Sequence, residues 1–178
     1  MAETGFDAPS PAAALRNLMR TEDTLDCPGA YDALSARVAL NYQFLALYVS
    51  VIGACGSCMT QADADSGAQT EFQDHVEMIA ELGMKNSAVV IADDETGAGD
   101  AVMADRMVKR HIKGTVAAVV ISDRLPALSK SAHGNDSVMS EQQFLERVNA
   151  ASNVRKSHGD SNHRPFEHVG VSGTTRGN

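Results

Sequence analysis

The sequence predicts a parallel α/β fold, and three observations support this prediction. Short apolar runs alternate along the chain with stretches in which apolar residues recur at helical spacing. The runs are nearly continuous in Val, Ile, Leu and Ala, as in strands that are covered on both faces. Strands that alternate with helices through short connections form parallel units. This pattern leaves open whether the sheet is doubly wound or part of a barrel.

Each predicted element is placed by its apolar spacing and its boundary residues. Ser10 supplies an N-cap for the first helix. The pairs Thr70/Gln73 and Ser140/Gln143 have capping-box spacing, so each predicts the start of a later helix. The predicted strands cover residues 24–27, 44–50, 87–93 and 116–122, and the predicted helices cover residues 10–20, 31–41, 70–83, 100–113 and 140–155.

The two ends of the chain differ in composition from its middle. Residues 1–9 are small and polar, and we expect a flexible N-terminus there. Residues 156–178 are rich in Gly, Ser, His and Arg without periodicity, so we expect a disordered tail. Residues 10–155 are expected to form a single domain, because a chain of 178 residues is long enough for one sizeable core.

Composition argues against several classes of partner. The net charge is -8 and no basic cluster interrupts it, which argues against nucleic acid or an acidic membrane surface as a partner. The apolar runs are too short to span a membrane, and the N-terminus lacks a signal-peptide pattern. Three cysteines, an odd number, suit a reducing compartment. We therefore expect a cytoplasmic protein.

The stretch with the most chemical content follows the third predicted strand. There the apolar run ends in Asp93, Asp94 and Glu95, and two glycines follow within four residues. Because side chains alternate along a strand, Asp93 and Glu95 project to the same side. Neighbouring carboxylates repel unless a cation lies between them, and Mg²⁺ is typically held by one or two carboxylates together with waters and substrate oxygens. The alternative is an acidic loop that only caps the next helix.

Several segments, in unbroken order, resemble the isocitrate lyase/phosphoenolpyruvate mutase superfamily, especially its 2-methylisocitrate lyase, dimethylmalate lyase and oxaloacetate hydrolase members. The similar segments are Leu15–Leu18 with Cys27–Arg37 at the opening, Leu45–Ser50 at an ALYxSG strand, Asp93–Gly99 at the DxDTGYG metal signature, and Val116–Arg124 and Ser140–Ala151 further on. The resemblance implies parallel (β/α) units of a TIM-type barrel, about the first half of it. Reacting residues would lie at the carboxyl ends of the strands.

The resemblance also implies roles for individual residues. Ser50 and Asp65 would bind the substrate, and Asp93 and Glu95 would hold Mg²⁺ or Mn²⁺. The implied reaction is metal-dependent cleavage of a carbon–carbon or carbon–phosphorus bond in a small 2-keto or 2-hydroxy carboxylate, with an enolate stabilised by the metal.

Departures from the family pattern favour an alternative, a catalytically impaired, truncated relative with weak or lost metal binding. Ser122 stands where the family has a carboxylate that assists the metal, and Val51 replaces a glycine that approaches the ligand. Of the loop that carries the family's catalytic cysteine, Lys130 and His133 remain, and no cysteine follows Cys58, so no complete catalytic set is retained. Half a barrel leaves a sheet edge uncovered, so we expect a homo-oligomer.

Overall fold

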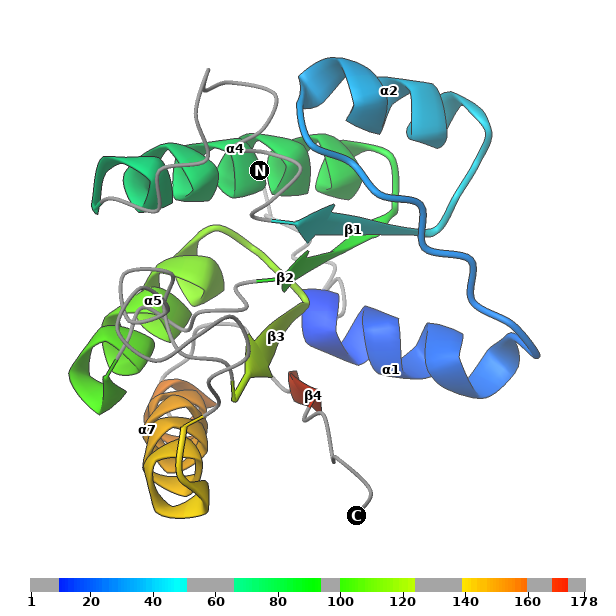
Figure 1. Cartoon of the computed structure of the whole chain (residues 1–178). Coiled ribbons are helices and arrows are strands. Elements are labelled where there is room, and N and C mark those ends of the chain that lie inside the picture. Colours follow the sequence, from blue (N-terminus) through cyan, green and yellow to red (C-terminus); the bar gives the residue numbers. More distant parts are fainter. Residues whose placement is uncertain (1–9, 51–65, 94–99, 124–138, 160–167, 173–178) are drawn as a thin grey trace, which may run out of the picture.

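Strands and helices alternate along the chain, as Figure 1 shows for a computed structural model that describes residues 10–50, 66–93, 100–123, 139–159 and 168–172. The elements are α1 Pro11–Thr21, α2 Ala33–Asn41, β1 Ala46–Ser50, α4 Ser66–Lys85, β2 Val89–Asp93, α5 Ala101–Lys113, β3 Ala118–Ser122, α7 Glu141–Gly159 and β4 His168–Ser172. The four strands form one parallel sheet in the order β1-β2-β3-β4. The predicted parallel α/β architecture is confirmed.

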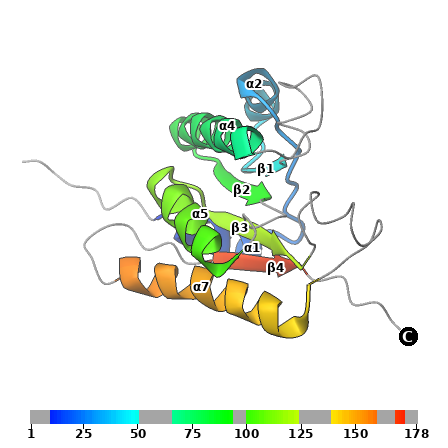
Figure 2. The ribbon, with the colours of Figure 1, turned by 60° about the vertical axis from the view of Figure 1, so that its left-hand side comes forward.

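Helices cover one face of the sheet, and the side chains on this face are apolar. The opposite, inner face carries polar residues at the strand ends. Leu47, Val90 and Val119 are buried residues of successive strands, and they belong to the same core cluster as residues of α2, α4, α5 and α7. Figure 2 shows α4, α5 and α7 arranged around the outside of the strands. Because side chains alternate along a strand, the intervening residues face inward. These inward residues are Ala46, Tyr48 and Ser50 of β1, Val89, Ile91 and Asp93 of β2, and Ala118, Val120 and Ser122 of β3.

Helix α1 covers the amino ends of the strands. Its Leu15 packs in a second cluster with Ala46, Val89 and Ala118, which are the first residues of β1, β2 and β3. The helix begins as predicted, because the hydroxyl of Ser10 accepts a hydrogen bond from the Ala13 amide at 3.2 Å. With the amino ends covered in this way, the carboxyl ends of the strands are where polar side chains gather.

The strand predicted over residues 24–27 is wrong, because these residues do not form a strand. Pairing with β1 occurs at Gly29, which forms an isolated parallel bridge with Tyr48. The Ala30 amide donates to the Tyr48 carbonyl at 2.8 Å, and the Tyr48 amide donates to the Pro28 carbonyl at 3.0 Å. Proline cannot donate to a sheet but its carbonyl can accept, so an edge segment tolerates it. The pairing with β1 in this segment therefore lies just after the predicted strand, at Gly29.

The two predicted capping boxes have different outcomes. At α7 the Ser140 amide donates to Gln143 Oε1 at 3.1 Å and the Gln143 amide donates to Ser140 Oγ at 3.3 Å, which confirms that pair. The Thr70/Gln73 prediction is wrong, because α4 already begins at Ser66. The Gln73 side chain has a tertiary partner instead, Arg110 of α5.

The C-terminal region contains more regular structure than its composition suggested. Helix α7 continues to Gly159, and β4 extends the sheet, with Val169 opposite Val119 and Ser172 opposite Ser122. The expectation of a disordered tail over residues 156–178 is therefore wrong for these parts. In His168–Ser172, Val alternates with smaller or polar residues, which is typical of a short strand. The flanking residues are rich in Gly, Ser and His, so the composition of the whole segment did not indicate a strand.

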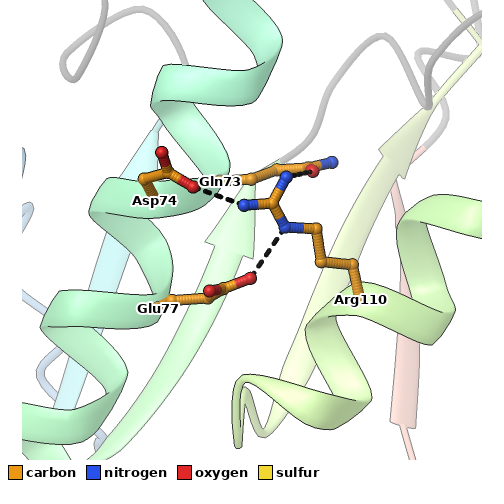
Figure 3. A network of polar contacts seen from close by, with 4 residues as sticks. All are labelled: Gln73, Asp74, Glu77 and Arg110. Atoms are coloured by element: carbon orange, nitrogen blue, oxygen red, sulfur yellow. Dashed lines mark hydrogen bonds and ion pairs between the residues drawn. The ribbon is translucent and has the colours of Figure 1, made fainter.

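A polar contact network joins α4 to α5 on the helix side of the sheet (Figure 3). Arg110 donates from Nε to Glu77 Oε1 and from Nη1 to Gln73 Oε1, each at 2.7 Å, and its Nη2 pairs with Asp74. The hydrogen bond to Glu77 is the main cause that raises the pKa of Arg110 above its ordinary value. With about a third of its side chain exposed, Arg110 orients two helices rather than serving a buried site.

Candidate functional site

Three polar residues stand at the carboxyl ends of successive strands. Ser50 ends β1, Asp93 ends β2 and Ser122 ends β3. Ser50 and Asp93 are direct partners in the strand register, while Asp93 lies opposite Val120, so Ser122 stands two residues further along β3. All three occupy inward-facing positions, because side chains alternate between the two faces along a strand. The sheet therefore gathers two hydroxyls and one carboxylate at the edge where parallel α/β proteins place ligands.

Burial distinguishes the carboxylate from a surface acid. Asp93 is 5% exposed and Ser122 is 9% exposed, whereas Ser50 is half-buried. A carboxylate that is removed from water to this extent requires donors or a cation around it. Burial of Asp93 at a strand end, rather than in a loop, argues against the alternative that the acidic stretch only caps the next helix. That helix, α5, has its own cap in Asp100, which accepts from the Met103 amide at 2.9 Å.

An apolar layer lies beneath these polar residues on the inner face. Tyr48, Ile91 and Val120 each precede the final inward residue of their strand, and each is half-buried. Tyr48 and Ile91 are direct partners in the register. A polar rim above an apolar floor is the usual composition of a small-molecule site, where a few polar groups orient a ligand and apolar walls exclude water.

Arg147 is a residue of this region that the sequence reasoning missed. It lies on α7, is 2% exposed, and donates from Nη1 to the carbonyl of Ser122 at 2.9 Å. The signal was present, because Arg147 occupies a position on the inward stripe of α7 with Phe144, Ala151 and Val154. A cation at an apolar position of an amphipathic helix indicates a buried polar contact.

The structure places two of the predicted site residues side by side. Ser50 and Asp93 are partners in the strand register, and Ser122 lies at the end of the next strand, while the roles of Ser50 and Asp93 in substrate and metal binding stay predictions. The remaining predicted residues, Asp65, Glu95, Lys130 and His133, lie outside the described residues.

The described donor set suits a hard cation only in part. Among the described residues, no three His, Cys, Asp or Glu side chains gather as metal ligands. Asp93 supplies one carboxylate, and Ser50 and Ser122 supply hydroxyl oxygens at the same edge. Mg²⁺ prefers oxygen ligands and keeps several waters, so one or two carboxylates together with substrate oxygens can be sufficient. The oxygen chemistry of these residues fits the metal that the resemblance implies, and Asp93 is the carboxylate among them.

Two further observations bear on how this part of the chain is used. Within the described ranges, no helix is both long and apolar enough to cross a membrane.

Cys27 is a free, partly buried thiol, and burial raises its pKa to about 11. With this pKa the thiol is protonated at neutral pH, which makes it a poor nucleophile.

The sequence matches the family model described as phosphoenolpyruvate phosphomutase over residues 15–161. The chain is 29% identical over 144 residues to the 2,3-dimethylmalate lyase of Eubacterium barkeri, a match that covers 81% of this chain and 49% of that protein. It is 31% identical over 148 residues to a 2-methylisocitrate lyase of Halalkalibacterium halodurans, covering 80% and 46% of the two chains. The chain thus spans about half the length of these relatives.

Solved structures show the same relationship. Oxaloacetate acetylhydrolase in complex with its product oxalate superimposes with a TM-score of 0.77 at 30% identity, covering 94% of this chain and 55% of that one. A phosphonopyruvate hydrolase in complex with oxalate and Mg²⁺ superimposes with a TM-score of 0.73 at 21% identity, which concerns the fold alone. These neighbours are members of a TIM-barrel superfamily, and the chain covers about half of a barrel chain, as predicted. The chain belongs to the isocitrate lyase/phosphoenolpyruvate mutase superfamily.

Proposed function

We propose that the carboxyl ends of β1, β2 and β3 bind a small 2-keto or 2-hydroxy carboxylate together with Mg²⁺ or Mn²⁺. The observation that carries this proposal is the buried carboxylate of Asp93, which ends its strand in register with Ser50 and above an apolar floor. The names of the similar proteins, 2,3-dimethylmalate lyase, 2-methylisocitrate lyase and oxaloacetate acetylhydrolase, support this substrate class.

In this proposal each residue has a defined part. Asp93 holds the cation together with Glu95, and the Ser50 hydroxyl donates to a substrate carboxylate, assisted by Asp65. The apolar floor that contains Tyr48 keeps water away from the reacting carbons. When bound, the metal would polarise the substrate carbonyl and favour an enolate, the chemistry of carbon–carbon or carbon–phosphorus bond cleavage.

A second candidate function, binding without efficient turnover, is favoured by the proton chemistry of the chain. Lyase cleavage requires a proton donor over the enolate, and general acid–base catalysis contributes about 10²–10⁴-fold. No cysteine follows Cys58, and only Lys130 and His133 remain in the corresponding segment. Ser122 also stands where the family has a carboxylate. We therefore propose that a reaction that relies mainly on the metal, decomposition of oxaloacetate, persists at a slow rate, and that lyase turnover is lost.

The assembly and location are parts of the same proposal. The inner-face residues Tyr48, Ile91 and Val120 are only half-buried, and Leu34 of α2 and Tyr42 directly after it are exposed. Association of the chain with another copy would therefore cover apolar surface. We propose a cytoplasmic homo-oligomer whose domain comprises residues 10–155 together with the end of α7 and strand β4.

An activity comparison tests the proposal. Oxaloacetate, dimethylmalate and methylisocitrate are each offered to the full chain with and without Mg²⁺, and to an Asp93→Asn variant that removes one charge at nearly constant volume. Asp23→Asn, an exposed acid, is the matched control. We expect slow, metal-dependent loss of oxaloacetate that Asp93→Asn abolishes and Asp23→Asn leaves intact. Rapid cleavage of dimethylmalate or methylisocitrate would contradict the proposed loss of lyase turnover. Activity that Asp93→Asn does not change would contradict the placement of the site at Asp93.

A further inference from the structure

The strand register places four residues of the inner face in one row across the sheet. Ser50 lies opposite Asp93, and Asp93 lies opposite Val120. On its other side, Val120 lies opposite Gly170 of β4. Neighbouring strands are about 4.8 Å apart, so each residue is the direct lateral neighbour of the next. The row therefore runs from a hydroxyl through a buried carboxylate to an isopropyl group, and it ends at a glycine.

Val120 differs from the other apolar residues of β3 in its surroundings. Val119 and Ile121 belong to the core on the helix side of the sheet, and Ala118 belongs to the second cluster, with Leu15 of α1. Val120 is only half-buried and belongs to neither of these clusters of described residues. An apolar side chain that lies level with a buried carboxylate and outside both clusters is available to contact a ligand.

The order of groups in this row gives a bound 2-keto acid one orientation. With the cation at Asp93, the carboxylate and the keto oxygen of the ligand both face the metal. The Ser50 hydroxyl can donate a hydrogen bond to the ligand carboxylate, whereas Val120 has no polar group to offer. The substituent on the keto carbon points away from the carboxylate, so it is directed toward Val120 and Gly170. Contact with an isopropyl group favours an alkyl substituent over a charged one.

We propose that Val120 is a specificity-determining residue, which together with Gly170 selects 2-keto acids that carry a branched alkyl substituent. This inference rests on the proposed function, because it assigns the substituent that the same site accepts. Two properties of the row can be changed separately. Val120→Thr retains the β-branched shape that suits a strand and replaces one methyl group with a hydroxyl. Gly170→Val places an isopropyl group where the row now ends at a glycine.

The test compares the binding of two ligands to the full chain by calorimetry in the presence of excess Mg²⁺. Pyruvate carries a methyl group on the keto carbon, and 3-methyl-2-oxobutanoate carries an isopropyl group. The wild type should bind the branched ligand about tenfold more tightly, because two further methyl groups are buried. Val120→Thr and Gly170→Val should each lower this ratio to about threefold or less, with pyruvate affinity within about twofold of the wild type. Val102→Thr, the same change at an exposed position of α5, should leave the ratio unchanged.

The outcomes separate this inference from the proposed function. If the wild type binds both ligands equally well, or if a folded variant at Val120 or Gly170 keeps the wild-type ratio, the inference is overturned while the proposed function stands. A variant that weakens both ligands equally also keeps the ratio and counts against the inference. A wild type that binds neither ligand would overturn both proposals. Circular dichroism checks the fold of each variant, and if one of the two fails to fold, the ratio in the other decides.

Discussion

Two glycines at helix ends have little room for a side chain, but different groups occupy the space that an added Cβ would need. This difference predicts opposite tolerance of alanine at the two positions. A Cβ added at Gly83, near the end of α4, would lie 2.9 Å from the Ala88 carbonyl oxygen and 3.2 Å from Val90 Cγ2. A Cβ added at Gly114, after α5, would also meet its nearest atom at 2.9 Å, but that atom is Glu77 Cγ. The first obstacle is backbone at the entry to β2, and the second is a rotatable side chain.

At each position, the gain in helix propensity and the cost of overpacking oppose each other. Their difference decides whether alanine raises or lowers the free energy of unfolding. Alanine in place of glycine in a helix gains up to about 1 kcal/mol, but overpacking a site that cannot adjust costs about 1–3 kcal/mol. At Gly83 the Ala88 carbonyl is fixed, because the Val89 amide, which lies in the same peptide plane, donates to the Leu45 carbonyl at 2.9 Å. We therefore expect Gly83→Ala to lower the free energy of unfolding by about 1–2 kcal/mol. At Gly114, displacing Glu77 costs at most its exposed contact with Arg110, about 0.2–1 kcal/mol, so Gly114→Ala should be close to neutral.

Urea unfolding followed by circular dichroism measures both variants against the wild type. Gly83→Ala should also lower the melting temperature by roughly 2–4 °C for each kcal/mol lost. The packing argument is refuted if Gly83→Ala is as stable as Gly114→Ala, or more stable than the wild type.

Three further predictions follow from single residues. Thr115 has φ 62, which costs a β-branched residue about 1–2 kcal/mol, so Thr115→Gly should raise the free energy of unfolding slightly in urea, and a clear loss would argue against strain there. Burial raises the pKa of Cys27 to about 11, so peptide mapping at pH 8 should show iodoacetamide labelling of Cys27 roughly 100-fold slower in the folded than in the unfolded chain; equal rates would refute the burial. Hydrogen bonds from Ser35 lower the folded pKa of Asp32 below 3.8, so its stabilising effect is present above about pH 4 and is lost as the pH falls through the lowered value, whereas Asp32→Asn should show no such loss in acid titrations of stability.

Local patterns predicted the sheet well because each strand has a distinctive composition. The runs that became β1, β2 and β3 are apolar on both faces until their last residue, and the polar terminal residue marks the site. The carboxylate Asp93 stood out at the end of its apolar run, whereas its pairing with Ser50 became known from the strand register.

The parts that the sequence did not predict depend on distant partners. Strand β4 has only five residues in a polar context, and it is a strand because β3 offers a partner for it. Arg147 lies on the apolar stripe of α7, but the stripe alone does not name its partner, the carbonyl of Ser122, 25 residues earlier. Gln73 resembled a helix-capping residue, but its partner is Arg110, 37 residues later. In each case a tertiary contact overrode a local preference.

The central claim is that Asp93 is the cation ligand of a carboxylate-binding site. Calorimetric titration of the full chain with Mg²⁺ in the presence of oxalate tests it most directly, with Asp93→Asn as the variant and Asp23→Asn as the exposed control. Weak, oxalate-assisted binding of Mg²⁺ is expected in the wild type and the control, with a loss of at least about tenfold in Asp93→Asn, because one of the few carboxylate ligands is removed. Binding of Mg²⁺ that is tight and unaffected by Asp93→Asn, or absent from the wild type, would contradict the claim.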